Sequence, residues 1–303
     1  MDEVFKSHGK LMITGEYFVL RGAKSLLLPT KFYQDMTVSR LNEGSSILWE
    51  SYDQNNSKWF SAKFNLPDLA IQGEETKEKI FLKKILNFIA KKNPKSFENN
   101  SGINIKTRMD FNRSWGLGSS AILINNLSSY FGLDPFEVSK NVTNSSGADI
   151  ASTKLSKPII FSIKEKKPSY KEVHFNPPFS KNLLFVFLNK KQSSAEEVEK
   201  FKKIRIEDDE IRTISEITNQ VVRCKKIDDF NDLIEKHESI ISSKIKKETV
   251  KNSLFKDFNG SIKSLGAWGG DFVLACGHNN LKNYFKNKGY SISFSFNEML
   301  KYY

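Results

Sequence analysis

A glycine- and serine-rich stretch at residues 112–127, NRSWGLGSSAILINNL, has the composition of an anion-binding turn. Gly116 and Gly118 allow a ligand to approach the backbone without a Cβ in the way, and the apolar run after Ser120 predicts a helix. The unpaired N–H groups and the dipole at the start of such a helix attract phosphate. Ser119 and Ser120 are able either to cap the helix or to offer hydroxyls to phosphate or Mg²⁺, so a simple capped helix is the competing interpretation. The stretch lacks the GK[ST] of a Walker A loop and the third glycine of a Rossmann fingerprint.

The segments around this stretch predict an α+β protein. GINIKTR, at residues 102–108, predicts a strand that leads directly into the glycine-rich turn. Short apolar runs broken by Gly and Pro predict further strands, and these runs are KLMI, YFVL, SLLLP, FYQDMTVSRL, PIIFSI, NLLFVFL, FVLAC and SISFSF. SSILWESYDQNNSKWFSAKFNL predicts a hairpin around DQNNS. Residues 74–92 and 193–243 have helical periodicity. The apolar face expected for the first of these helices is formed by Ile80, Phe81, Ile85, Phe88 and Ile89.

The domain organisation depends on one charged segment. KEKKPSYKEV, at residues 164–173, contains a proline and separates the strand-rich first half from the second half. We therefore expect one domain over 1–165, which carries the glycine-rich turn, and a second over 166–303.

The composition excludes some classes of protein and leaves others open. The net charge is +12, from 47 basic and 35 acidic residues, but lysine is mixed with glutamate and no basic block alternates with aromatics. We interpret the charge as solvated surface and expect no nucleic-acid partner, although nucleic-acid binding stays as a hypothesis that depends on charge alone. No apolar run reaches membrane-spanning length and the N-terminus has no signal-like apolar region, so we expect a cytoplasmic protein without a membrane partner. Cys224 and Cys276 are expected to be buried thiols, and His237 a core residue.

Four segments, in order, resemble the motifs of one enzyme family. GLGSSA at 116–121 resembles the central motif of the GHMP kinases, which include galactokinase, homoserine kinase, mevalonate kinase and phosphomevalonate kinase. GKLMITGEYFVLRG at 9–22 resembles the first motif of that family, and SLGAWGGDFVLAC at 264–276 resembles the third. NSSGADIASTKLSKPIIF at 144–161 is similar to the segment that carries the catalytic aspartate. The resemblance spans nearly the whole chain.

The resemblance implies a fold and a reaction. The fold would have two domains, an N-terminal one similar to ribosomal protein S5 domain 2 and a ferredoxin-like C-terminal one. The reaction would be in-line transfer of the γ-phosphoryl group of ATP, bound with Mg²⁺, to a small alcohol or anionic acceptor. GEY in the first motif, DIAS after Asp149 and GGDFVLA in the third look more like phosphomevalonate kinase than mevalonate kinase. GADIA also resembles a bacterial GHMP group named for a Gly-Tyr-Asp-Ile-Ala segment. We expect phosphomevalonate or mevalonate as the acceptor, and a monomer or homodimer.

The resemblance also assigns catalytic roles. Asp149 matches the catalytic aspartate, against the alternative that it only forms an Asx turn. Lys10 matches a lysine that reaches the acceptor, where it would lower the pKa of a neighbouring acid and stabilise developing negative charge, against the alternative of a surface lysine. Ser120 matches a serine that contacts Mg²⁺. Glu137, the only glutamate between the turn and Asp149, would be the second Mg²⁺ ligand, although a solvated helix charge is nearly as probable a role.

Further positions would bind the nucleotide or the acceptor. Gly116, Leu117, Gly118, Ser119 and Ser120 would form the phosphate loop. The expected acceptor-binding residues are Glu16, Tyr17, Ser194 and Gly269. Glu16 has a structural role as its alternative, and Ser194 fits a helix cap equally well.

Three residues depart from the family pattern. The family usually has proline where Asn112 stands, and small residues where Trp115 and Trp268 stand. We expect the two indoles either to narrow the nucleotide pocket or to stack on adenine. These departures favour an alternative hypothesis, a GHMP-fold binding or regulatory protein that has lost catalysis, whereas the joint presence of Lys10, Ser120 and Asp149 argues against it.

Overall fold

The chain divides into two compact units, which are described separately. A computed structural model describes residues 2–41, 44–97, 102–143, 145–192, 194–278 and 280–301, and of residues 194 and 195 it describes the backbone alone. The first unit comprises Met1–Gly9, Phe32–Arg113 and Gly118–Lys154, and the second comprises Lys10–Lys31, Ser114–Leu117 and Leu155–Tyr303. In the described part of the chain, no helix has both the length and the apolar character needed to cross a membrane.

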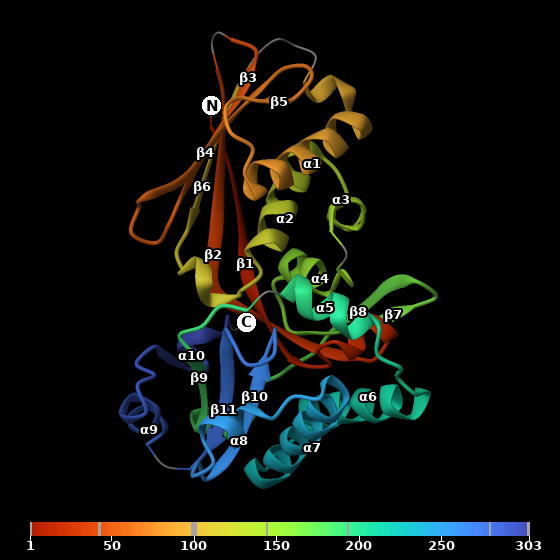
Figure 1. Ribbon diagram of the computed structural model, residues 1–303, viewed down its shortest axis with the longest axis vertical. Coiled ribbons are helices and arrows are strands. Elements are labelled where there is room, and N and C mark those ends of the chain that lie inside the picture. The colour runs from red at the N-terminus through yellow and green to blue at the C-terminus, as the bar shows by residue number, and fades with distance from the viewer. Residues whose placement is uncertain are drawn as a thin grey trace. The chain divides into compact units, whose positions relative to one another are not determined.

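The first unit is a sheet with helices on one side (Figure 1). Its strands follow the order β5-β4-β3-β6-β2, with β3 and β6 parallel and the other pairs antiparallel. The strand bounds are β2 Ser25–Arg40, β3 Ser46–Tyr52, β4 Lys58–Asn65, β5 Ala70–Ile71 and β6 Ile103–Met109. The helices are α1 Lys77–Lys92, α2 Ser119–Phe131, α3 Pro135–Val142 and α4 Ala148–Leu155, with a 3₁₀ turn at Pro94–Ser96. Residues of α1 and α2, such as Ile85 and Leu127, share one buried core with the strands, where Trp49 and Ile105 lie.

The second unit contains a β-α-β-β-α-β arrangement. Its antiparallel sheet has the order β10-β11-β9-β12, so that β9 and β11 are central. The strands are β7 Ile159–Lys164, β8 Lys167–Glu172, β9 Leu183–Phe187, β10 Gly260–Leu265, β11 Phe272–Gly277 and β12 Ser293–Ser295. The helices are α5 Ser194–Lys202, α6 Asp208–Arg223, α7 Ile227–Ile245, α8 Val250–Leu254, α9 Leu281–Asn287 and α10 Phe296–Met299, and α6 lies beside α7 (Figure 1). This succession is the ferredoxin-like topology that the resemblance implied.

Strand β1, at Glu3–Thr14, pairs with β2, and both strands contribute residues to each unit. Residues Ser25–Leu27 of β2 pair with β7 in the second unit, and β7 pairs in turn with β8. Short 3₁₀ turns lie at Phe18–Arg21, Arg113–Trp115 and Ser180–Asn182.

Most of the expected elements are confirmed. The α+β class, the hairpin around DQNNS, the helix within 74–92 and the strand before the glycine-rich turn are all present. The apolar face of α1 is confirmed at Ile85 and Ile89, which are buried, and at Phe81 and Phe88, which pack partly buried against the same core. Ile80 is 39% exposed, and Leu82 and Leu86 are buried in addition. Cys276 is buried as expected, whereas Cys224 is only half-buried, and both are free.

Two expectations are wrong. YFVL is not a strand, because Phe18–Arg21 forms a 3₁₀ turn after Tyr17, whose φ is +63°. Residues 164–173, expected to separate the two domains, instead belong to a hairpin in which β8 pairs with β7 and which turns at Glu165 and Lys166, both with positive φ. The two compact units are discontinuous in sequence, because Lys10–Lys31 and Ser114–Leu117 belong with the residues from Leu155 onward. The pairing of β7 with Ser25–Leu27 of β2 lies within this second unit.

Candidate active site

The glycine-rich turn leads into a helix that no side chain caps. Gly118 is the N-cap of α2, with φ 84° and ψ 33°, and no side-chain hydrogen bond caps this end. Its carbonyl accepts from the N–H groups of Ala121 and Ile122, while Ser119 is half-buried and Ser120 exposed. The serine-capped helix is therefore not what forms here. An uncapped first turn leaves N–H groups and the positive end of the helix dipole for an anion, and an exposed hydroxyl at Ser120 suits a hard cation such as Mg²⁺.

Lys10 is not a surface lysine. It lies in β1 in the second unit and is 8% exposed. Its backbone N–H donates to the carbonyl of Leu117, at 3.1 Å, so β1 is attached directly to the glycine-rich turn. A lysine so far removed from water needs negative charge around it, which the phosphates of a nucleotide or a carboxylate can supply.

Asp149 lies in the first turn of α4, in the first unit, and is half-buried. The turn before it contains Gly147 at φ +85°, and the hydroxyl of Ser146 accepts from the N–H of Ala148. The side chain of Ser146, and not that of Asp149, therefore caps the N–H of Ala148 at this helix start.

Glu137 lies in α3 and makes an ion pair with Lys92 at the end of α1, with both side chains about two-fifths exposed. Glu137 lies beyond the C-terminal end of α2, whereas Ser120 lies at the N-terminal end of that helix. The helical rise from Ser120 to Phe131 is about 16 Å. This placement gives no support to Glu137 as a Mg²⁺ ligand together with Ser120. Within the described residues, no group of three or more acidic, histidine or cysteine side chains is arranged to hold a metal.

The side chains of both tryptophans make contacts within the protein. Trp268 is 4% exposed, its backbone N–H donates to the Tyr17 hydroxyl at 2.9 Å, and its indole N–H donates to the carbonyl of Glu248 at 2.9 Å. The idea that Trp268 stacks on adenine is therefore wrong. Trp115 lies edge-on to Phe272 and Phe294 in the same unit, with ring centroids 5.9 and 5.1 Å apart.

The remaining expected acceptor residues have different environments. Tyr17 is buried and its ring packs on Phe201 with centroids 5.2 Å apart, so its hydroxyl serves the segment around Trp268. Gly269 has φ +76° and open space where a Cβ would project, which leaves room for a ligand. Ser194 is the first residue of α5, and its side chain lies outside the described residues.

Comparison with known proteins decides the fold. No family model and no curated protein sequence matches the chain. Among solved structures, Methanococcus jannaschii mevalonate kinase is similar over 95% of both chains, with 19% identity and a TM-score of 0.69. Streptococcus pneumoniae phosphomevalonate kinase in complex with phosphomevalonate and AMPPNP covers 97% of this chain and 99% of its own, with 16% identity and a TM-score of 0.72. Lactococcus lactis galactokinase complexed with galactose covers 95% and 89%, with 15% identity and a TM-score of 0.67.

The chain has the GHMP kinase fold. The similarity extends over nearly the full length of these chains, so both units belong to it. At this level of identity it establishes the architecture, and the chemistry has to be argued from the residues.

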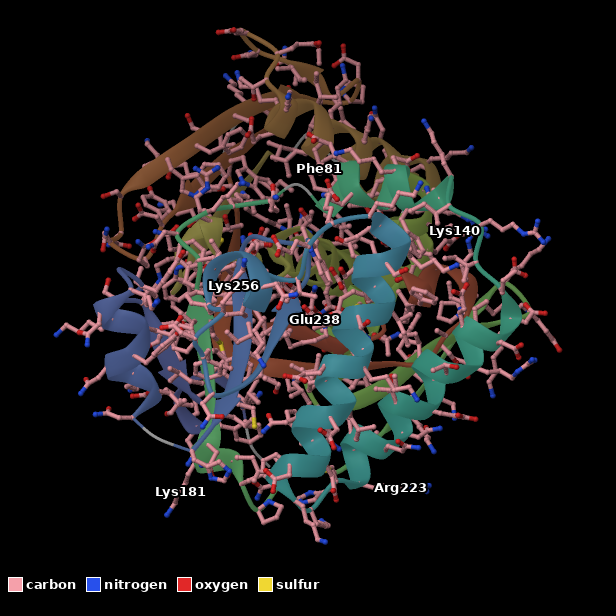
Figure 2. All side chains as sticks on the ribbon, turned by 60° about the horizontal axis from the view of Figure 1, so that its bottom comes forward. Phe81, Lys140, Lys181, Arg223, Glu238 and Lys256 are labelled. Carbon is pink, nitrogen blue, oxygen red and sulfur yellow. The ribbon has the colours of Figure 1, made fainter. Side chains whose placement is uncertain are left out.

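Within this GHMP kinase fold, the second unit contains a buried charge cluster that the sequence did not reveal. The Lys263 ammonium lies 2.7 Å from Oε1 of Glu16 and 3.0 Å from Oε1 of Glu238, and none of these side chains is more than 4% exposed. Nε2 of His237 accepts from the N–H of Gly15 at 2.9 Å. Figure 2 shows Glu238 on α7, the helix that packs on β10. The cluster therefore attaches the turn of the first motif, at Gly15 and Glu16, to the strand that leads into the third.

Burial controls the protonation of this cluster. It raises the pKa of Glu238 to about 7 and that of Glu16 above its usual value, although Lys263 opposes both shifts. The pKa of His237 is held well below its ordinary value, first by burial and then by the charge of Lys263. His237 is thus a neutral core residue, as expected from the sequence, and its Nε2 is the unprotonated nitrogen that accepts from Gly15.

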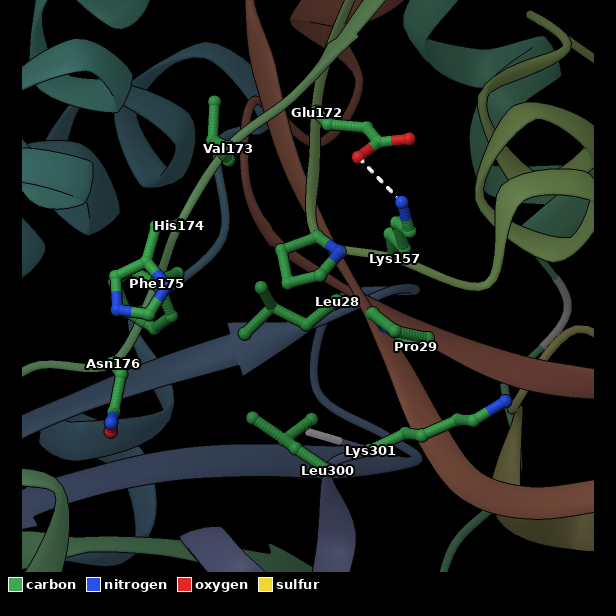
Figure 3. Close-up of a pocket in the computed structure, with 11 residues that line it drawn as sticks. Leu28, Pro29, Lys157, Glu172, Val173, His174, Phe175, Asn176, Leu300 and Lys301 are labelled. Carbon is green, nitrogen blue, oxygen red and sulfur yellow. Dashed lines mark hydrogen bonds and ion pairs between the residues drawn. The ribbon is translucent and has the colours of Figure 1, made fainter. Parts of the chain in front are cut away.

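Two cavities, one in each unit, are lined by residues other than the expected site residues. One of about 380 Å³ in the second unit is lined by Leu28, His174 and Leu300, next to the ion pair of Lys157 with Glu172 (Figure 3). Another, of about 590 Å³, lies between α1 and α3 in the first unit and is lined by Lys84, Lys91 and Lys140 among others. The candidate site is defined by the residues of the three motifs and not by these cavities.

Proposed function

We propose that this chain is an ATP-dependent small-molecule kinase that transfers the γ-phosphoryl group to phosphomevalonate or mevalonate. The observation that carries this proposal is the uncapped start of α2 behind a glycine-rich turn. It stands in a fold whose similar structures include a mevalonate kinase, a phosphomevalonate kinase and a galactokinase. An uncapped helix start behind a glycine-rich turn, in a fold shared with kinases, is best explained by nucleotide binding.

The nucleotide would be held by the turn and the first turn of α2. The backbone N–H groups from Gly116 to Ser120 would hydrogen-bond the phosphates, and the Ser120 hydroxyl would be a ligand of Mg²⁺. The AMPPNP in the pneumococcal structure supports ATP as the donor. Mg²⁺ would neutralise charge on the phosphates and so assist transfer. Mg²⁺ usually takes few protein ligands and keeps several waters, so a single serine next to the phosphates is sufficient.

Lys10 and Asp149 would act on the acceptor. Lys10 would neutralise charge as the phosphoryl group moves, which is the main means of catalysis in such transfers. Asp149 would accept the proton of an alcohol acceptor, which is barely ionised at neutral pH. A phosphomonoester acceptor has its second pKa near ~6, is already nucleophilic, and would need Asp149 much less. The loss of transfer rate in Asp149→Asn should therefore be large with mevalonate as the acceptor and small with phosphomevalonate.

The decisive experiment is ³¹P NMR of the purified protein with Mg-ATP and, one at a time, mevalonate, 5-phosphomevalonate, homoserine and galactose. A new phosphomonoester or diphosphate signal with matching ADP identifies the acceptor. Asp149→Asn should abolish most of this signal with an alcohol acceptor, while Glu298→Gln, a change at an exposed ion pair outside the four motif segments, should not alter it. ATP binding without transfer would favour the non-catalytic alternative, and absence of ATP binding would refute the proposal.

A further inference from the structure

Asp271 follows the third glycine-rich segment and is held from several sides. It is 5% exposed and adopts φ +51°, an unusual conformation for an aspartate. Its backbone N–H donates to the carbonyl of Lys190 at 2.7 Å, and its carbonyl accepts from the N–H of Leu188 at 2.8 Å. Oδ1 of its carboxylate accepts from the N–H of Gln192 at 3.3 Å. The position and direction of this carboxylate are therefore well determined.

The carboxylate lies against the phosphate loop. A Cβ built on Gly116 would lie 2.5 Å from Cγ of Asp271 and 3.1 Å from its Cβ, and would overlap Oδ2. A Cβ on Gly266 would meet the same oxygen at 3.7 Å. The carboxylate thus occupies the space between a glycine of the loop and a glycine of the third motif. The adjacent residues continue the contact, since Trp115, before Gly116, lies edge-on to Phe272, after Asp271.

The charge around this carboxylate is positive. Burial raises the pKa of Asp271, while the N–H of Gln192 and the charges of Lys10 and Lys191 partly offset that rise. Lys10 is bonded through its backbone to Leu117, the residue next to Gly116. The buried lysine and the buried carboxylate therefore contact neighbouring residues of the loop, Lys10 at Leu117 and Asp271 at Gly116.

We propose that Asp271 is a positioning residue of the phosphate loop: its carboxylate holds Gly116 against the third motif, and its negative charge acts on Lys10, whose backbone is bonded to the loop. It follows that residue 116 must be glycine because of Asp271, in addition to any need for close approach by phosphate. The catalytic part of this inference rests on the proposed kinase function. The steric part does not depend on the kinase function, because it concerns only the contact between Gly116 and Asp271 within the second unit.

The steric part is tested by a pair of substitutions and a matched control. Gly116→Ala adds a Cβ that collides with Asp271, at a left-handed φ of +66°. Gly132→Ala adds one at φ +67° with no atom within 4 Å, so it reports the backbone strain alone. We expect Gly116→Ala to lower the melting temperature more than Gly132→Ala, and Gly116→Ala/Asp271→Gly to recover the excess. Equal losses in the two single variants, or no recovery in the double variant, would overturn the proposal. These melting temperatures require neither nucleotide nor turnover.

The catalytic part is tested by Asp271→Asn, which keeps the shape of the side chain and removes its charge. Because a small displacement of a reacting group costs up to about 100-fold in rate, we expect kcat to fall about 10- to 100-fold while the KM for ATP and the melting temperature change little. An unchanged kcat would overturn this part. If the wild type transfers no phosphoryl group to any acceptor, the proposed function fails, and the comparison of Gly116→Ala with its double variant still decides whether Asp271 positions the loop.

Discussion

Lys263→Met is the most informative perturbation of the buried charge cluster. The ammonium lies 2.7 Å from one carboxylate and 3.0 Å from another, with all three side chains at most 4% exposed. At an effective dielectric constant near 20, each attraction is about 5–6 kcal/mol before desolvation. Removal of one partner of a buried pair leaves the other charge uncompensated and typically costs about 3–5 kcal/mol. For a unit of this size, that corresponds to a fall in melting temperature of about 6–20 °C.

The assay is differential scanning calorimetry at pH 8, with Lys282→Met as the matched control. Lys282 makes an ion pair with Glu298 at 2.9 Å, but the two side chains are 52% and 53% exposed. An exposed pair is worth at most about 1 kcal/mol, so the control should lower the melting temperature by only a few degrees. Burial is then the main difference between the two lysines.

A second variant and a second pH make the interpretation specific. Glu16→Gln/Lys263→Met/Glu238→Gln removes every charge of the cluster and should be more stable than Lys263→Met alone, because no buried carboxylate is left without a cation. The deficit of Lys263→Met should also shrink at pH 5.5, where its two carboxylates can take up protons. If Lys263→Met were no less stable than Lys282→Met, the argument that this lysine compensates two buried carboxylates would be refuted.

Glu238, Tyr17 and Ser120 carry the remaining predictions. Burial raises the pKa of Glu238 to about 7, above its unfolded value of 4.5, so its contribution to stability is present below pH 4.5 and is lost as the pH rises through 7. Urea unfolding should therefore show a steeper fall between pH 5 and 8 for the wild type than for Glu238→Gln, and parallel curves would contradict this. Tyr17→Phe leaves the buried N–H of Trp268 without its acceptor and should cost about 1–3 kcal/mol in urea unfolding; an unchanged stability with a raised KM for the acceptor would instead place Tyr17 in the acceptor site. Ser120→Ala should weaken the binding of Mg-ATP in calorimetry but not that of ATP with EDTA, and equal effects on both would exclude the hydroxyl as a Mg²⁺ ligand.

Local patterns explain why several elements could be predicted from the sequence. The periodicity within 74–92 and the alternation of β6 are set by neighbouring residues, which is also why the start of α2 behind Gly118 was foreseeable. The same local reasoning predicts a strand at YFVL, and that prediction is wrong because Phe18–Arg21 forms a 3₁₀ turn. The turn at Gly15 and Tyr17 has positive φ angles, and it is held by His237 and Trp268 from distant segments. Tertiary contacts outweigh local propensity at such a site.

The candidate site, too, has parts that the sequence predicted and parts that only the structure showed. The amino-acid sequence by itself determined the glycine-rich turn and the helix that follows it, because these features are properties of short segments. The resemblance of its motifs to those of the GHMP kinases supplied Lys10, Ser120 and Asp149 as candidates. Only the tertiary structure showed that Lys10 is buried and that Trp268 is buried with its indole N–H bonded to the carbonyl of Glu248.

Only the tertiary structure, too, brought Lys263 to Glu16, 247 residues away, and Asp271 to Gly116. Neither pair has a local signature, since nothing in a lysine or an aspartate beside a glycine run indicates which distant residue it will meet. A buried charge is tolerated only where the fold supplies its partner, and that partner is chosen by the packing of strands and helices and not by spacing along the chain.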